Sequence, residues 1–115
     1  MNKEETKGLI IKIILSSPEL KNDYAILLNN SFGYMKNRIH EHYDRQKDNP
    51  RADTIKYLVA NSEQNMRMVY ANIISFKVKA ELEKSLGAGI DLEVFRGIMP
   101  EVIDDLASGN QGFAV

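Results

Sequence analysis

The chain has 115 residues, of which 43% are hydrophobic and 27% charged, with a formal net charge of −1 and no cysteine. These values predict one globular domain of ordinary composition, and they exclude disulfides, thiolate catalysis and cysteine-based metal sites. The near-zero net charge excludes an overall attraction to polyanions or to anionic membranes.

Membrane insertion and secretion are not predicted. The longest apolar run, residues 9–15, is interrupted by Lys12 and is far shorter than the ~20 residues that span a bilayer. Its flank contains acidic residues, and no small-residue cleavage site follows it, which does not fit a signal peptide. We therefore expect a cytoplasmic protein with no membrane partner.

Charge is distributed unevenly along the chain. Residues 1–33 are balanced, residues 34–80 carry nine positive and five negative side chains, and residues 81–115 carry two and seven. This polarity predicts either that the basic middle and the acidic end attract each other in the fold, or that both are solvated surfaces.

The first element is predicted to be a helix over Lys3–Ser16. The segment is rich in β-branched residues, which favours a strand. However, no second convincing strand is present to pair with it, and a lone strand is not stable. Its apolar residues also satisfy helical spacing, at Leu9, Ile10, Ile13 and Ile14.

The second predicted helix begins at Ser17–Pro18–Glu19 and runs to about Gln46. Serine is a good N-cap, proline suits the first helical position, and an acidic residue there favours the helix dipole. Apolar residues follow at steps of mostly three and four. Residues 29–31 and Gly33 lower the helix propensity in the middle, so a kink or a break there stays open.

The longest predicted helix covers residues 54–86, with Asp53 as its cap and no glycine or proline inside. Its apolar residues form a helical stripe from Ile55 to Ala80. Such a helix is ~50 Å long, whereas a domain of this size has a radius of gyration near ~13 Å. We therefore expect that it kinks near Asn61–Asn65 or packs against another copy of the chain.

Two short helices and a loose tail are predicted to complete the fold. Gly87 and Gly89 end the long helix, and Asp91 caps a short helix that bends at Met99 before Pro100. The predicted fold is all-α, a four- to five-helix bundle around the 54–86 helix. Residues 1–107 form a single helical domain, and residues 108–115 form a flexible tail.

Two features suggest a protein–protein interface. Short polar side chains on the long helix can hydrogen-bond across a helix seam and fix an oligomeric state. The acidic C-terminal helices can present a hydrophobic anchor to a groove. The candidate interface residues are Asn61, Asn65, Asn72, Ser75, Phe95 and Met99.

A basic segment, residues 36–56, suggests an alternative function. Cations with interleaved aromatic residues bind phosphates and stack bases, so nucleic acid or an anionic ligand such as a nucleotide is the alternative partner. Acidic residues in the same segment also predict local ion pairs. The candidate phosphate-binding residues are Lys36, Arg38, Arg45, Arg51 and Arg67.

No catalytic, metal or cofactor site is predicted. His40 and His42 are two residues apart and therefore point to different sides of a helix, with no further ligands nearby in sequence. No phosphate loop, dinucleotide fingerprint or nucleophile–base set is present. We predict that the chain is not an enzyme.

In size and helical style the chain resembles small helical proteins of phages and bacterial mobile elements, which include inhibitors, adaptors and immunity factors. This resemblance is one of style and matches no motif. The predicted function is a non-enzymatic protein–protein interaction module that self-associates. Nucleic-acid or anionic-ligand binding through residues 36–56 is the alternative.

Overall fold

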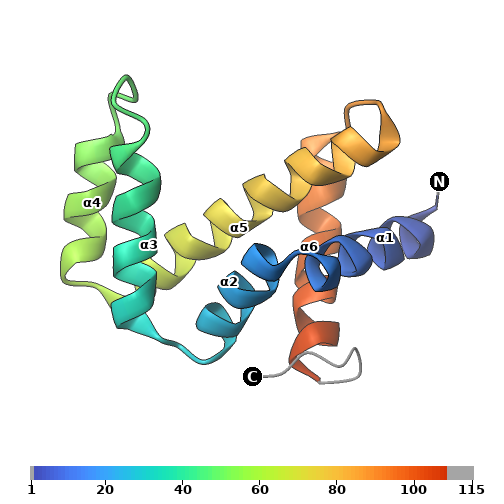
Figure 1. The fold of residues 1–115 in the computed structure, drawn as a ribbon, viewed down its shortest axis with the longest axis horizontal. Coiled ribbons are helices and arrows are strands. Elements are labelled where there is room, and N and C mark those ends of the chain that lie inside the picture. Colours follow the sequence, from blue (N-terminus) through green and yellow to red (C-terminus); the bar gives the residue numbers. More distant parts are fainter. Residues whose placement is uncertain (1, 109–115) are drawn as a thin grey trace. The chain divides into compact units, whose positions relative to one another are not determined.

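The computed structural model describes residues 2–108, and this part of the chain consists of helices without any strand (Figure 1). The all-α prediction is therefore confirmed. The predicted tail lies, apart from Ser108, outside the described residues. The elements are α1 (Lys3–Ser16), α2 (Pro18–Leu28), α3 (Phe32–Asp44), α4 (Ala52–Ala60), α5 (Glu63–Leu86) and α6 (Leu92–Ala107).

Several helix ends follow the predicted local chemistry. Helix α1 has the predicted bounds, and Asn2 caps it by accepting the Glu5 N–H at 2.8 Å. Helix α2 starts at Pro18, with the Ser17 hydroxyl accepting the Leu20 N–H at 3.3 Å. At the end of α5, Gly87 has a φ of +67°, a left-handed conformation that glycine adopts without steric cost.

The predicted helix over residues 18–46 is two helices, α2 and α3. The break lies at residues 29–31, where Asn30 has a φ of +51°. Asparagine is one of the few residues that adopt the left-handed region readily, because its short polar side chain can hydrogen-bond locally. Gly33, which also weakens the helix pattern, lies inside α3.

Residues 54–86 are not one helix, and of the two expected outcomes the structure has the interruption near Asn61–Asn65, as a break between α4 and α5. Asn61 leaves the helical conformation at φ −129° and ψ 13°, and the Ser62 hydroxyl accepts the Asn65 N–H at 3.2 Å to begin α5. Asparagine and serine compete with helical hydrogen bonds in this way. The 24 residues of α5 span ~36 Å. The length argument for packing against a second copy therefore no longer holds.

Two further predictions are corrected at helix ends. Helix α4 begins at Ala52, so Asp53 lies in its first turn and Arg51 occupies the cap position without a side-chain hydrogen bond. Helix α6 is one helix that contains Pro100, not two short helices with a bend. Its buried residues continue on both sides of the proline, and this packing outweighs the lost hydrogen bond. Asp91 does cap α6, accepting the Val94 N–H at 3.1 Å.

The chain forms two compact units. The first comprises Met1–Ala25 and Ile74–Val115, and the second comprises Ile26–Ile73. The division falls inside α2 and inside α5, so each of these helices contributes to both units. Whether residues 1–107 behave as the single domain predicted from the sequence stays a prediction.

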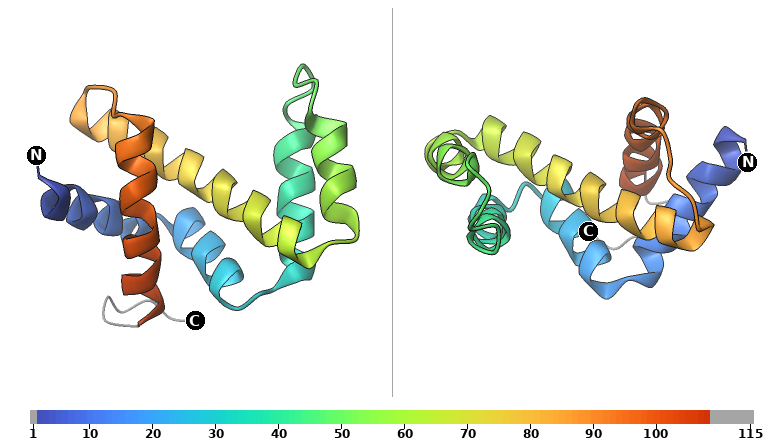
Figure 2. Two further views of the ribbon diagram at one scale, coloured as in Figure 1. Left: turned by 180° about the vertical axis from the view of Figure 1, so that it is seen from behind. Right: turned by 90° about the horizontal axis from the view of Figure 1, so that it is seen from above.

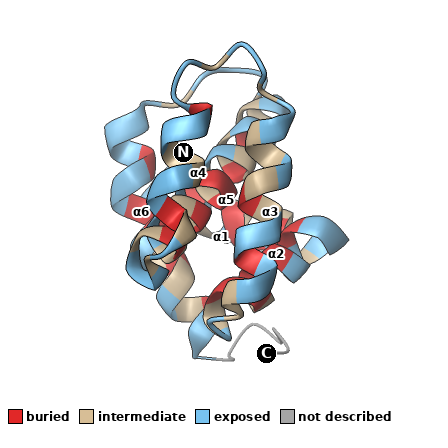
Figure 3. Ribbon diagram, turned by 90° about the vertical axis from the view of Figure 1, so that its left-hand side faces the viewer, coloured by how far each residue is buried: buried red, intermediate tan, exposed pale blue. Residues whose placement is uncertain are grey.

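In the first unit α1 packs against α6, and in the second α3 packs against α4 (Figure 2). Each helix exposes some positions and buries others (Figure 3). The first unit buries Ile10, Ile14, Tyr24, Val78, Leu82, Phe95, Val102 and Leu106, and the second buries Leu27, Met35, Ile39, Val59, Met66 and Tyr70.

Candidate interaction surface

The outer face of α4 is uncharged and carries two large exposed apolar side chains. Tyr57 is 79% exposed and Leu58 is 49% exposed. Thr54 and Asn61, also exposed, lie three to four residues on either side, so the four share one side of the helix. The opposite side of α4 is anchored by Val59, which is fully buried. We call Thr54, Tyr57, Leu58 and Asn61 the α4 outer face.

The joint between α4 and α5 borders this face. The Asn65 side-chain amide donates to the Leu58 carbonyl at 3.4 Å, and so satisfies a carbonyl at the end of α4 that has no partner within its own helix. The Asn65 backbone N–H is bonded to Ser62. Asn65 therefore connects the two helices, while Asn61 lies exposed at the end of α4.

The remaining predicted interface residues lie elsewhere. Asn72 is exposed on α5, and Ser75 is half-buried on the same helix within the first unit. Phe95 and Met99 are 1% and 4% exposed on α6. These two side chains belong to the buried part of the first unit, so they can anchor a partner only if α6 moves.

The α4 outer face was hidden in the sequence by the assumption of one continuous helix. Under that assumption Leu58 falls in the predicted apolar stripe and is expected to be buried. The assumption also fails further along the chain, since Met68 and Phe76 on α5 are 58% and 69% exposed. The expected kink near Asn61–Asn65 marks the place of the break, but the apolar stripe was drawn through it. Taken alone, residues 54–61 place Tyr57 nearly opposite Val59, with Leu58 on the same side as Thr54 and Asn61.

The predicted basic set is not one surface. The Arg67 guanidinium donates to the Leu27 carbonyl at 2.6 Å and to the Asn30 side chain at 3.1 Å. It therefore caps the end of α2 and supports the left-handed Asn30. Lys36 and Arg45 are nine residues apart on α3, which places them on opposite sides of that helix.

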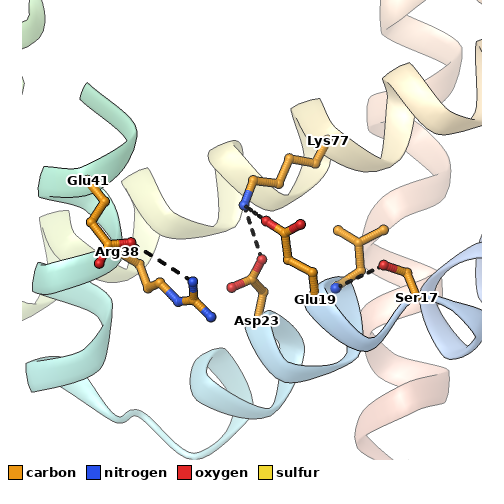
Figure 4. A network of polar contacts seen from close by, with 7 residues as sticks. Ser17, Glu19, Asp23, Arg38, Glu41 and Lys77 are labelled. Carbon is orange, nitrogen blue, oxygen red and sulfur yellow. Dashed lines mark hydrogen bonds and ion pairs between the residues drawn. The ribbon is translucent and has the colours of Figure 1, made fainter. Parts of the chain in front are cut away.

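The other predicted cations lie around the α3–α4 connection. Arg45 and Arg51 are exposed, and Arg38 lies seven residues before Arg45 on the same side of α3, with Glu41 4.0 Å from its guanidinium (Figure 4). Lys56 donates to Asp44 at 2.8 Å and joins α4 to α3. This hydrogen bond is the main cause of a lowered pKa for Asp44 and a raised pKa for Lys56.

A shallow cavity of about 300 Å³ lies between α1 and α6 in the first unit, with Thr6, Gly97 and Ile98 in its lining. Its polar groups are already used within the unit. The Thr6 hydroxyl donates to the Asn2 carbonyl, and Lys3 pairs with Glu101. The cavity therefore adds no chemistry to the surface on α4.

Among residues 2–108, no group of three or more histidine and carboxylate side chains is placed to hold a metal ion. Of the two histidines, His42 at the end of α3 lies 2.9 Å from the Gln46 side chain. Over the same residues, no helix is both long and apolar enough to cross a bilayer.

No protein-family model, no curated protein and no solved structure gives a significant match to this chain.

Proposed function

We propose that the chain is a non-enzymatic interaction protein that self-associates through the α4 outer face. The observation that supports this is the adjacent pair of Tyr57, 79% exposed, and Leu58, 49% exposed, on a helix face without charge. Tyrosine is enriched among the residues that contribute most binding energy, and interface centres are depleted in charged residues.

A second copy of the chain is the partner that this chemistry favours. A two-fold contact brings the same patch together from both subunits, so any charge on the patch would face its own copy. The α4 outer face has no charge to oppose in this way. Lys56 and Asp53, of opposite sign, flank it on α4. A nine-residue helix offers a small area, so we expect a weak dimer, with a dissociation constant of about 10–100 µM.

The broader role that we propose is that of a small adaptor, inhibitor or immunity-type protein acting in the cytoplasm. The lack of cysteine suits a reducing compartment.

Sedimentation velocity tests the proposal, at protein concentrations from about 1 µM to about 500 µM to bracket the expected constant. The wild type is expected to shift from monomer to dimer, and Tyr57→Asp is expected to stay monomeric because two carboxylates would then face each other. Tyr34→Asp is the matched control. Tyr34 is 68% exposed on α3 in the same unit, so its variant should dimerise like the wild type.

Circular dichroism establishes that both variants keep their helices. A wild type that stays monomeric at every concentration would overturn the proposal. Equal weakening by Tyr34→Asp and Tyr57→Asp would also overturn it, because it would place the contact outside the α4 outer face.

A further inference from the structure

The connection between α3 and α4 carries three exposed cations at the end of a helical hairpin. Residues 45–51 contain Arg45, Lys47 and Arg51 but only one acidic residue, Asp48. Among the described residues, no ion pair is recorded for any of the three cations. Figure 1 shows the connection as a loop that projects beyond the ends of both helices. Lys47 belongs to the basic segment 36–56 identified in the sequence, although it is not one of the candidate phosphate-binding residues named there.

The loop is held in shape by its amide side chains and not by its cations. The Gln46 amide lies 2.9 Å from the His42 ring, and the Asn49 amide donates to Gln46 at 3.0 Å. The Asn49 side-chain oxygen then accepts the Arg51 N–H at 2.9 Å. The guanidinium and ammonium groups therefore remain available to an external ligand on a preformed loop, which lowers the entropy cost of binding.

With Asp48 counted, residues 45–51 carry a net charge of +2, and the acids on either side of the loop do not cancel it. Asp44 accepts from Lys56 at 2.8 Å, and Asp53 lies 3.7 Å from the same ammonium group. Lys56 thus partly neutralises the two carboxylates that flank the loop. Arg38, on the same side of α3 as Arg45, extends the positive charge ~10 Å along the helix.

We infer that this loop binds the phosphate backbone of a nucleic-acid strand. The planar arginine fork matches the geometry of a phosphate group bidentately. A spacing of ~10 Å between Arg38 and Arg45 allows contacts to more than one phosphate of the same strand. Residues 45–51 contain no large apolar side chain that could enter a bilayer, which favours a nucleic acid over an anionic membrane.

The inference goes beyond the proposed self-association and does not depend on it, because the α4 outer face is formed by other residues. Phosphate contacts from the three loop cations and from Arg38 predict that the logarithm of the binding constant falls with the logarithm of salt concentration with a slope of about −3 to −4. The binding should be weak at physiological salt and insensitive to base sequence, since phosphate contacts carry no sequence information.

Fluorescence anisotropy with a labelled single-stranded oligonucleotide of ~20 nucleotides, titrated from about 20 mM to about 200 mM salt, tests the inference. The wild type should bind at low salt with this slope. The triple variant Arg45→Gln/Lys47→Gln/Arg51→Gln should bind at least about tenfold more weakly, with a slope reduced to about −1 because only Arg38 remains.

The matched control removes the same charge from the first unit, in the triple variant Lys12→Gln/Lys21→Gln/Lys84→Gln. These lysines are exposed and lie outside the α3–α4 loop. This variant should bind within about threefold of the wild type. Phosphatidylserine vesicles test for a membrane as the true ligand.

Three results would overturn the inference. The wild type could fail to bind at the lowest salt, the two triple variants could lose affinity equally, or vesicles could bind where the oligonucleotide does not. Tyr57→Asp, which targets the proposed dimer, should bind the oligonucleotide like the wild-type monomer. Failure of either proposal can therefore be recognised separately.

Discussion

The two units use their charged side chains differently. In the first unit, lysines join pairs of helices: Lys7 pairs with Asp105 at 2.8 Å between α1 and α6, and Lys77 pairs with Glu19 and Asp23 between α5 and α2. In the second unit, many polar contacts lie at helix ends and in connections, where Arg67 donates to the Leu27 carbonyl and Asn65 to the Leu58 carbonyl.

This difference revises the view of charge taken from the sequence. The acidic C-terminal stretch finds cationic partners in two places: Glu101 and Asp105 pair with Lys3 and Lys7 of α1, and Glu83 pairs with Lys79 at the end of the basic middle. The basic middle also keeps three cations on the surface of its α3–α4 loop. Both units contain interhelical ion pairs and exposed lysines, but the second unit gathers three exposed cations in a single loop.

The largest expected effect comes from the pair formed by Lys77 with the buried Asp23 (Figure 4). The Asp23 side chain is 1% exposed, and its carboxylate lies 3.2 Å from the Lys77 ammonium. Lys77→Met keeps the apolar stem but removes this charge from beside a buried carboxylate. We expect a loss of about 2–3 kcal/mol in the free energy of unfolding, measured by urea denaturation.

Lys3→Met is the control for that experiment, because the side chains of Lys3 and Glu101 are 56% and 41% exposed. Its loss should stay below about 1 kcal/mol. Equal losses in the two variants would show that burial of the carboxylate does not decide the strength of the interhelical pairs in the first unit.

A smaller effect is expected at the helix starts of the second unit. Ser62 accepts the Asn65 N–H at 3.2 Å, whereas Ser31 occupies the cap position of α3 without a side-chain hydrogen bond. Ser62→Ala should therefore lower the free energy of unfolding by about 1 kcal/mol, and Ser31→Ala by only a few tenths. Thermal denaturation of both variants measures the difference, and a larger effect at Ser31 would contradict the role given to helix caps.

Sequence reasoning succeeded where the structure is decided by neighbouring residues. Asp91 caps α6 and Gly87 ends α5 because each acts on the backbone within a few positions of itself. A kink near Asn61–Asn65 was one of two outcomes expected from the length of the 54–86 helix, but a full break was not predicted because the apolar spacing continues through it. At Pro100 the opposite error occurred, since apolar packing on both sides keeps α6 continuous.

The candidate site was less predictable than the fold, because its residues depend on contacts distant in sequence. Arg67 looked like a phosphate ligand, yet its partners Leu27 and Asn30 lie 40 and 37 residues away. Phe95 looked like an anchor, but its burial is a property of the folded unit and not of its own helix. The exposure of Tyr57 became evident only once α4 was separated from α5.

The smallest expected effect concerns the connection between α5 and α6 in the first unit. The Glu83 carboxylate accepts the Ile90 N–H at 2.8 Å and lies 3.1 Å from the Lys79 ammonium. The bond from Ile90, aided by Lys79, lowers the pKa of Glu83 from its ordinary 4.5. The folded state thus binds this proton more weakly than the unfolded state, so the contribution to stability is complete above pH 4.5 and is lost as pH falls through the lowered pKa.

Glu83→Gln should remove that part of the acid dependence of the melting temperature while leaving its slope unchanged above pH 6, a near-neutral range where the carboxylate is ionised in both states. Asp44→Asn, which breaks the contact to Lys56 in the second unit, is the comparison. It should change the acid dependence of the melting temperature in a lower pH range than Glu83→Gln does, because an aspartate titrates below a glutamate. Identical acid profiles for Glu83→Gln and the wild type would show that the turn before α6 is held without this carboxylate.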